Sequence, residues 1–110
     1  MGNPTIEQFK KDLGKEYSIK YIDSERCLFR DFGNGFDVEI SQCNRTRYNQ
    51  NKKAIIYLWY KERPKIVKVI QDVGRNASAI NEAVEELHSF SKQLLLDAYR
   101  TVTKTRREEA

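Results

Sequence analysis

The chain has 110 residues, a net charge of +4, 39% hydrophobic residues and 33% charged residues. This length suits a single domain over residues 1–110 with one core, and the composition excludes a disordered chain. No segment approaches the roughly 18 apolar residues of a membrane span, and the start has no apolar signal region, so we expect a soluble, cytoplasmic protein. Cys27 and Cys43 are too few for a disulfide framework and are expected to be reduced.

The predicted elements begin with a short helix at residues 4–14. Pro4 suits a first helical position, and Thr5 with Gln8 forms a possible capping box, in which each side chain bonds the backbone N–H of the other residue. Gly14 ends the helix, because glycine tolerates the backbone conformation that follows a last helical turn.

Three strands are predicted next, at residues 17–22, 26–32 and 36–41. Between the second and the third, Gly33-Asn34-Gly35 is the strongest hairpin signal in the chain. Along residues 36–41, apolar Phe, Val and Ile alternate strictly with Asp, Glu and Ser. Since successive side chains of a strand point to opposite faces, one face of this strand should be buried and the other wet.

A fourth strand is predicted at residues 54–60, the only run of seven apolar or aromatic residues, which includes the single tryptophan. Both of its faces are apolar, so we expect an interior strand that is covered on both sides. A fifth strand at residues 66–73 should place Ile66, Lys68 and Ile70 on one face.

A long helix is predicted to begin near Asn76 or Ser78, either of which would cap it, and its tail at about residues 105–110 is expected to fray. Apolar residues from Ile80 to Val102 follow helical spacing. We therefore predict an α+β domain with a short N-terminal helix, a five-stranded antiparallel β-meander and a long C-terminal helix packed on one sheet face.

Positive charge is concentrated around the fourth strand. Residues 41–68 hold eight basic side chains and one acid, a net charge of +7, whereas the remaining residues hold 12 basic and 15 acidic side chains, a net charge of −3. Basic side chains beside an aromatic residue on a sheet surface are typical of proteins that hold single strands. The structural alternative is a solvated loop and sheet edge, which lysine and arginine protect from aggregation.

From this charge we predict a non-enzymatic binding module. Its partner would be nucleic acid, single-stranded or RNA, or an acidic protein or nucleoprotein surface, because the same positive field attracts both. The residues expected to contact the partner are Arg45, Arg47, Tyr48, Lys52, Lys53, Lys61, Arg63 and Lys65.

The order of antiparallel strands followed by a long helix is loosely similar to the single-strand-binding domains of the PUR and Whirly kind. The size and topology also resemble the small inhibitors that phages and mobile elements direct against host defence, including anti-CRISPR proteins. The second resemblance implies the alternative function, a protein-directed inhibitor or adaptor that would use the basic face against an acidic surface. Both resemblances concern topology and size, so neither assigns a role to a residue.

A third hypothesis is a metal-dependent nuclease, because Asp37 and Glu39 share a strand face and carboxylates bind Mg²⁺. Solvated strand acids are the alternative. His88 and two cysteines sixteen residues apart lack the spacing of a zinc site, and no nucleophile stands in a catalytic motif. We therefore expect no enzyme activity, no metal and no cofactor.

Two residues of the C-terminal helix, Leu96 and Tyr99, lie off its apolar stripe, with Lys92 and Arg100 at the rim. They are candidates for a homodimer or partner contact through this helix. A second layer over the helix, or plain exposure, is the alternative.

Overall fold

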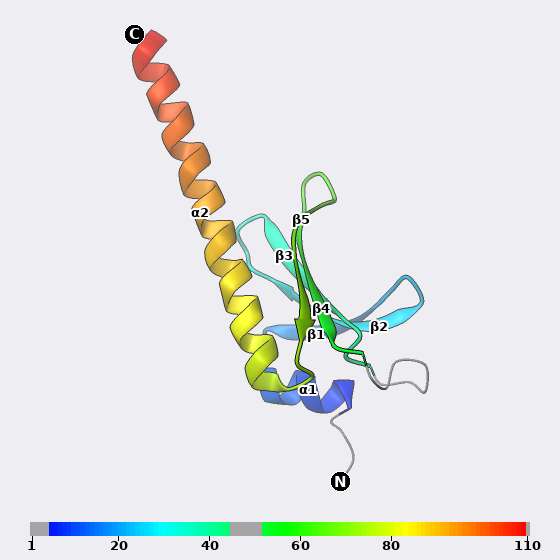
Figure 1. Ribbon diagram of the computed structural model, residues 1–110. Helices are drawn as coiled ribbons and strands as arrows, with labels where there is room; N and C mark the ends of the chain where they lie inside the picture. The colour runs from blue at the N-terminus through cyan, green and yellow to red at the C-terminus, as the bar shows by residue number, and fades with distance from the viewer. Residues whose placement is uncertain (1–4, 45–51, 110) are drawn as a thin grey trace.

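The computed structural model of the protein describes residues 5–44 and 52–109, with side chains described up to residue 102. Figure 1 shows a sheet with a long helix along one side. In chain order, the elements are α1 (Ile6–Leu13), β1 (Tyr17–Ile22), β2 (Glu25–Asp31), β3 (Phe36–Ser41), β4 (Ala54–Tyr60), β5 (Lys65–Val73) and α2 (Ala77–Glu109). The predicted α+β arrangement is confirmed. The bounds of β1, β3 and β4 agree with the prediction, and those of α1, β2 and β5 differ from it by at most two residues.

Local hydrogen bonds fix the ends of both helices. The Thr5 hydroxyl accepts from the Gln8 amide at 3.2 Å, and Gly14, with φ of 119°, ends α1. Asn76 caps α2, because its side-chain oxygen accepts from the Ala79 amide at 2.8 Å. Of the two caps that the sequence allows for α2, the structure uses Asn76.

The five strands form one sheet in chain order, and each strand is antiparallel to the next. Asp23 and Ser24, both at positive φ, make a two-residue turn between β1 and β2. The predicted hairpin turn between β2 and β3 also forms, with Gly33 and Gly35 at φ of 76° and 92°. Asn34 in that turn donates to the Ser91 hydroxyl of α2 at 3.0 Å, so the hairpin is tied to the helix.

Both helices pack on the same face of the sheet, and the core lies between them and the strands. Alternate residues of β3 and β4 supply the sheet side of the core, and the apolar stripe of α2 supplies the other side. Full burial of each such side chain stabilises the folded chain by about 1.5–3 kcal/mol. The fully buried core residues include Ile6, Phe9, Leu28, Val38, Ile40, Ile56, Leu58, Ile80, Val84 and Leu87.

The long helix α2 continues beyond the sheet. Its 33 residues correspond to roughly 50 Å at 1.5 Å per residue, and Figure 1 shows its C-terminal part extending past the strands. Large apolar side chains on this part are exposed, at 42% for Leu95, 43% for Leu96, 69% for Tyr99 and 51% for Val102. Among the described helices, none combines the length and the apolar composition that a membrane crossing needs.

Three predictions about the strands are wrong. The face of β3 that the sequence predicts to be wet is not, because Glu39 and Ser41 are each only 8% exposed and Asp37 is half-buried. β4 is interior in its hydrogen bonding, between β3 and β5, but no described element covers the face that carries Ile55, Tyr57 and Trp59. The alternation of β5 is also broken, because a register shift places Ile66 opposite Trp59 while Lys68 lies opposite Leu58. Such a bulge sends the two residues to opposite faces of the sheet.

Candidate binding site on the open face

The sheet face that points away from α1 and α2 is called the open face below. Strand alternation and register assign its side chains, since Asp37 lies opposite Trp59 and Glu39 opposite both Phe29 and Tyr57. Its central members are Lys20, Ile22, Phe29, Asp37, Glu39, Tyr57, Trp59, Ile66 and Val69.

The open face is hollowed. A cavity of about 330 Å³ is lined by side chains of β1, β2, β3 and β4 and of the turn after β4. A neighbouring cavity of about 250 Å³ shares Ile22, Glu39 and Trp59 with it. Ile22 on one edge strand and Ile66 on the other line this second cavity together, so the sheet curves around it. The first cavity, called the acidic cavity below, is lined by Ile22, Phe29, Asp37, Glu39, Trp59, Tyr60, Lys61 and Pro64.

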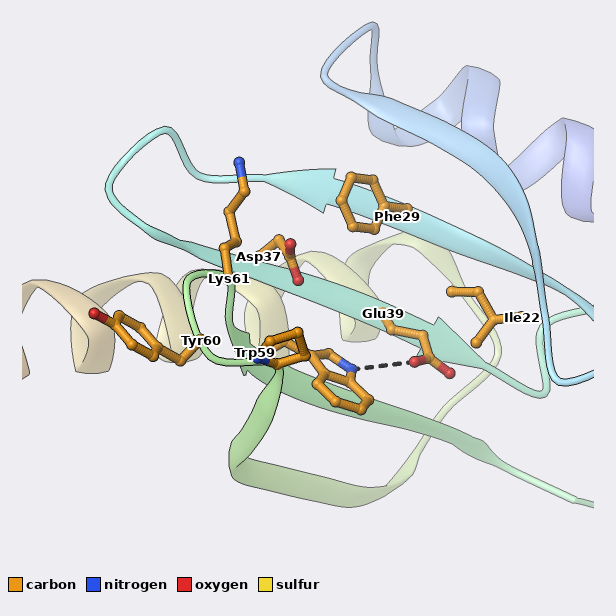
Figure 2. A pocket seen from close by; sticks show the side chains of 8 residues that line it. Ile22, Phe29, Asp37, Glu39, Trp59, Tyr60 and Lys61 are labelled. Carbon is orange, nitrogen blue, oxygen red and sulfur yellow. Dashed lines mark hydrogen bonds between the residues drawn. The ribbon is translucent and has the colours of Figure 1, made fainter.

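Two carboxylates lie between two aromatic rings in the acidic cavity, as Figure 2 shows. Asp37 and Glu39 both come from β3, Phe29 comes from β2, and Trp59 comes from β4. Directly opposed residues of an antiparallel pair have Cβ atoms about 4.5–5.5 Å apart, so each acid has an aromatic neighbour across the strands. The indole Nε1 of Trp59 donates to Oε1 of Glu39 at 3.1 Å, which fixes the ring against that acid.

Glu39 is only 8% exposed although no helix covers it. Burial raises the pKa of this carboxyl, and the hydrogen bond from Trp59 opposes that rise. Within residues 5–44 and 52–109, the donor to its second oxygen, Oε2, is the weak Sγ of Cys27 at 3.9 Å. Cys27 is buried as well, and its burial, together with the charges of Glu25 and Glu39, raises the pKa of its thiol to about 12.

Asp37 is the less satisfied of the two acids. Burial raises the pKa of its carboxyl, and the negative charge of Asp31, directly opposite on β2, adds to the rise. Within the described residues, the side chain of Asp37 forms no hydrogen bond and no ion pair. Asp31, in contrast, accepts from the Gly33 amide at 2.8 Å and pairs with Lys61, which lowers the pKa of Asp31.

The charges around the two cavities are mostly acidic. Among the described residues, the two lysines beside Asp31 and Phe29 are already engaged: Lys61 pairs with Asp31, and the Lys20 ammonium lies 3.7 Å from the centroid of the Phe29 ring. Arg63 adds a positive charge in the exposed turn next to Lys61. Glu25 is engaged as well, since it accepts from the Ser41 hydroxyl and from the Gln42 amide. The acids in this region are Asp23, Glu25, Asp31, Asp37 and Glu39.

The predicted basic residues lie at the two ends of β4. Lys52 and Lys53 are exposed just before the strand, whereas a second group lies at or after its other end. The seven residues of β4 separate the groups by roughly 20 Å. The second group consists of Lys61, Arg63 and Lys65, all exposed. Arg45, Arg47 and Tyr48 lie outside the described residues.

Lys68 and the helix residues lie elsewhere. The Lys68 ammonium is 4.3 Å from the ring centroid of Phe90 on α2, so this lysine belongs to the covered face and does not extend either basic group. Leu96 and Tyr99 are exposed in the C-terminal half of α2, off its apolar stripe as the sequence predicts. His88 stacks on Phe32 with ring centroids 4.2 Å apart.

The described residues contain no group of three or more His, Cys, Asp or Glu side chains that would hold a metal ion. Asp37 and Glu39 do share the open face, as the nuclease hypothesis requires, but Glu39 is bonded to Trp59. Carboxylates beside aromatic rings can bind a cation or a group rich in hydrogen-bond donors.

Sequence reasoning did not assign Phe29, Trp59 and the two acids to one site. The sequence does carry a signal for this site, because the acids of residues 36–41 alternate with apolar residues and so lie on one face of the strand, next to aromatic residues of the following strand.

Comparison of the chain with protein-family models, with curated protein sequences and with solved structures gave no match.

Proposed function

We propose that the protein is a non-enzymatic binding module that docks a partner protein on its open face, as an inhibitor or adaptor would. The observation that carries the proposal is the aromatic and aliphatic surface left without a covering element on this face. Ile66 and Val69 are 41% and 37% exposed there, beside the half-buried Tyr57 and Trp59. Exposed apolar surface with a polar rim is typical of protein interfaces.

The charge of the open face favours a basic protein segment over nucleic acid at its centre. Asp37 and Glu39 lie in the middle of the acidic cavity, where a phosphate group would meet two carboxylates. A partner with basic side chains at its centre would instead complement them. The basic residues at both ends of β4 would then contact acidic groups at the rim of the same partner.

The test is capture of a partner from a lysate of the source cells with the full chain as bait. A double variant, Ile66→Lys with Val69→Lys, alters the open face, and a matched variant, Leu96→Lys with Tyr99→Lys, makes the same chemical change on α2. The captured protein is identified, purified and titrated against each variant. We expect the wild type and the α2 variant to bind it, the open-face variant to bind at least roughly tenfold more weakly, and nuclease treatment to change nothing.

Three outcomes contradict this proposal. Equal binding by the open-face variant would show that the partner docks elsewhere, and loss of binding by the α2 variant would place the contact on the helix. Loss of capture after nuclease treatment would favour the second candidate function.

The second candidate function is nucleic-acid binding by the basic residues at the ends of β4. The observation that favours it is that Lys52 and Lys53 are exposed and form no ion pair within the described part of the chain. They line a hollow of about 300 Å³, together with Gln42, Ile55, Gln71 and one acid, Asp72. Lysines in such a setting make phosphate contacts, and amides can reach base edges.

This candidate is tested by the fluorescence anisotropy of a labelled single-stranded RNA and of its DNA equivalent. Lys52→Glu with Lys53→Glu should weaken binding, whereas the matched change Lys10→Glu with Lys11→Glu on α1 should not. Affinity should also fall steeply as salt is raised, because bound counterions are released. Affinity that is independent of salt, or equal in both variants, would contradict nucleic-acid binding.

A further inference from the structure

We infer that the acidic cavity receives an arginine side chain of the partner, with the guanidinium between Phe29 and Trp59 and the Asp37 carboxylate as its main acceptor. This inference rests on the proposed function and names the chemical group that the open face would recognise.

The carboxylate oxygens of the acidic cavity favour a cationic ligand. The Asp37 carboxylate has no hydrogen bond or ion pair with any described residue, although its side chain is half-buried in the wall of the acidic cavity. Glu39 uses Oε1 for the Trp59 indole, and among the described side chains its Oε2 has the weak contact with the Cys27 thiol alone. A buried or half-buried carboxylate is stabilised by a strong donor, so these two acids leave acceptor positions for a cation.

The shape of the site is the second argument. Asp37 and Glu39 are two residues apart on one strand, which places them roughly 7 Å apart along β3. A guanidinium carries five N–H donors in one plane, so it can reach acceptors in more than one direction while its flat faces stack on aromatic rings. An ammonium is a compact, strongly hydrated charge, and it would lose more water for fewer directed bonds.

The fixed cations near the cavity are the third argument. Lys20 lies over the ring of Phe29, and Lys61 pairs with Asp31 at the rim. The chain therefore already uses both elements of the proposed recognition, an aromatic face and a carboxylate, to hold its own cations. Within the described residues neither lysine forms an ion pair with Asp37 or Glu39. The charges of Lys61 and Lys20 do act on Asp37 and oppose the rise of its pKa by burial, but they leave its oxygens without a donor among those residues, so these oxygens can accept from the partner.

The test uses the single tryptophan as its reporter. The probe is Nα-acetyl-arginine amide, and the readout is the indole N–H resonance of Trp59 in a ¹H–¹⁵N spectrum of the full chain. Nα-acetyl-citrulline amide has nearly the same shape without the charge, and Nα-acetyl-lysine amide has the charge without the planar fork. We expect a saturable shift with the arginine compound, a response at least roughly tenfold weaker with the lysine compound, and none with the citrulline compound.

Two variants locate the site. Asp37→Asn should abolish the saturable shift, whereas Asp12→Asn, an acid-to-amide change on exposed α1, should leave it unchanged. Asp37→Asn is expected to fold, because the aspartate side chain has no hydrogen bond within the described residues to lose, and its melting temperature checks this directly.

Equal responses to arginine and citrulline, equal responses to arginine and lysine, or a shift that survives Asp37→Asn would overturn the inference. These failures differ from failure of the proposed function. If partner capture depends on the open face but the arginine compound does not bind, only the assignment of the cavity is wrong. If the arginine compound binds but capture ignores the open face, the cavity is a cation site without the proposed docking role.

Discussion

The two faces of the sheet are made by alternate residues of the same strands, yet they differ in nearly every physical property. On β3, Val38 and Ile40 are fully buried under the helices, whereas Asp37 and Glu39 point to the open face. The covered face is apolar at its centre, and its charged side chains Arg30 and Lys68 contact Glu85 and Phe90 of α2. The open face combines aromatic rings with acids whose pKa values are raised by burial.

This difference separates the part of the sheet that stabilises the fold from the part that is available for recognition. When folding raises the pKa of a carboxyl group, its ionised form is less favourable in the folded chain than in the unfolded chain. Asp37 and Glu39 therefore lower the free energy of unfolding at neutral pH. Groups that cost stability and lie in a cavity are candidates for function. Asp37 and Glu39 on the open face are therefore residues whose charges the fold itself does not require.

The largest expected effect is on the covered face. Leu58→Ala should lower the free energy of unfolding by about 2–5 kcal/mol, because Leu58 is fully buried and its loss leaves a cavity. Ile66→Ala, on the open face and 41% exposed, should cost less than about 1 kcal/mol. Urea denaturation of both variants measures the contrast, and similar losses in the two would show that the open face is part of the core.

The next largest effect on stability is expected at the N-terminal cap of α2, the helix that covers the sheet. Asn76→Ala should lower the free energy of unfolding by about 1 kcal/mol, because the Ala79 amide loses its acceptor. Ser78→Ala is the matched control, since Ser78 is exposed and its side chain forms no hydrogen bond within the described residues. Thermal unfolding followed by circular dichroism compares them, and a larger loss in Ser78→Ala would contradict the assigned cap.

The smallest effect is a dependence on pH at the open face. Asp37→Asn should raise stability at neutral pH by about 0.5 kcal/mol, because water still reaches this half-buried carboxyl and screens its charge. The pKa of Asp37 is raised in the folded chain, so wild type regains this stability as pH falls through the raised pKa toward the ordinary value. The advantage of the variant should therefore shrink in acid.

The contribution of acids with lowered pKa values, such as Asp31, is common to both proteins and largely cancels in this comparison. Urea denaturation across acidic and neutral pH measures the difference. An advantage that grows in acid would show that Asp37 has a stabilising partner and would contradict the description of the acidic cavity.

Much of the fold could be predicted from local patterns. The alternation along residues 36–41 assigned the two faces of β3, and Gly33-Asn34-Gly35 located the hairpin. These features depend on residues that are neighbours in the sequence, so they can be recognised from one sequence alone. The bulge in β5 could not be predicted, because it depends on how Ile66 and Lys68 pair with β4.

The site was harder to predict because extended strands separate residues that are close in sequence. Lys53 and Lys61 are eight positions apart, yet they lie at opposite ends of β4. The segment that is most basic in the sequence therefore brackets a face whose centre is acidic. Pairing of β3 with β4 brings Asp37 and Trp59 together across a sequence separation of 22 residues, and this pairing has no local signature.

The central claim is that Trp59 lies in an accessible and acidic cavity, and collisional quenching of its fluorescence tests this most directly. Caesium, a cation, and iodide, an anion, are each compared with their quenching of free N-acetyl-tryptophan amide. The account predicts that caesium retains more of its quenching efficiency than iodide, and that Asp37→Asn reduces this preference. A preference for iodide would mean that the open face is basic, and absence of quenching by both ions would mean that it is covered.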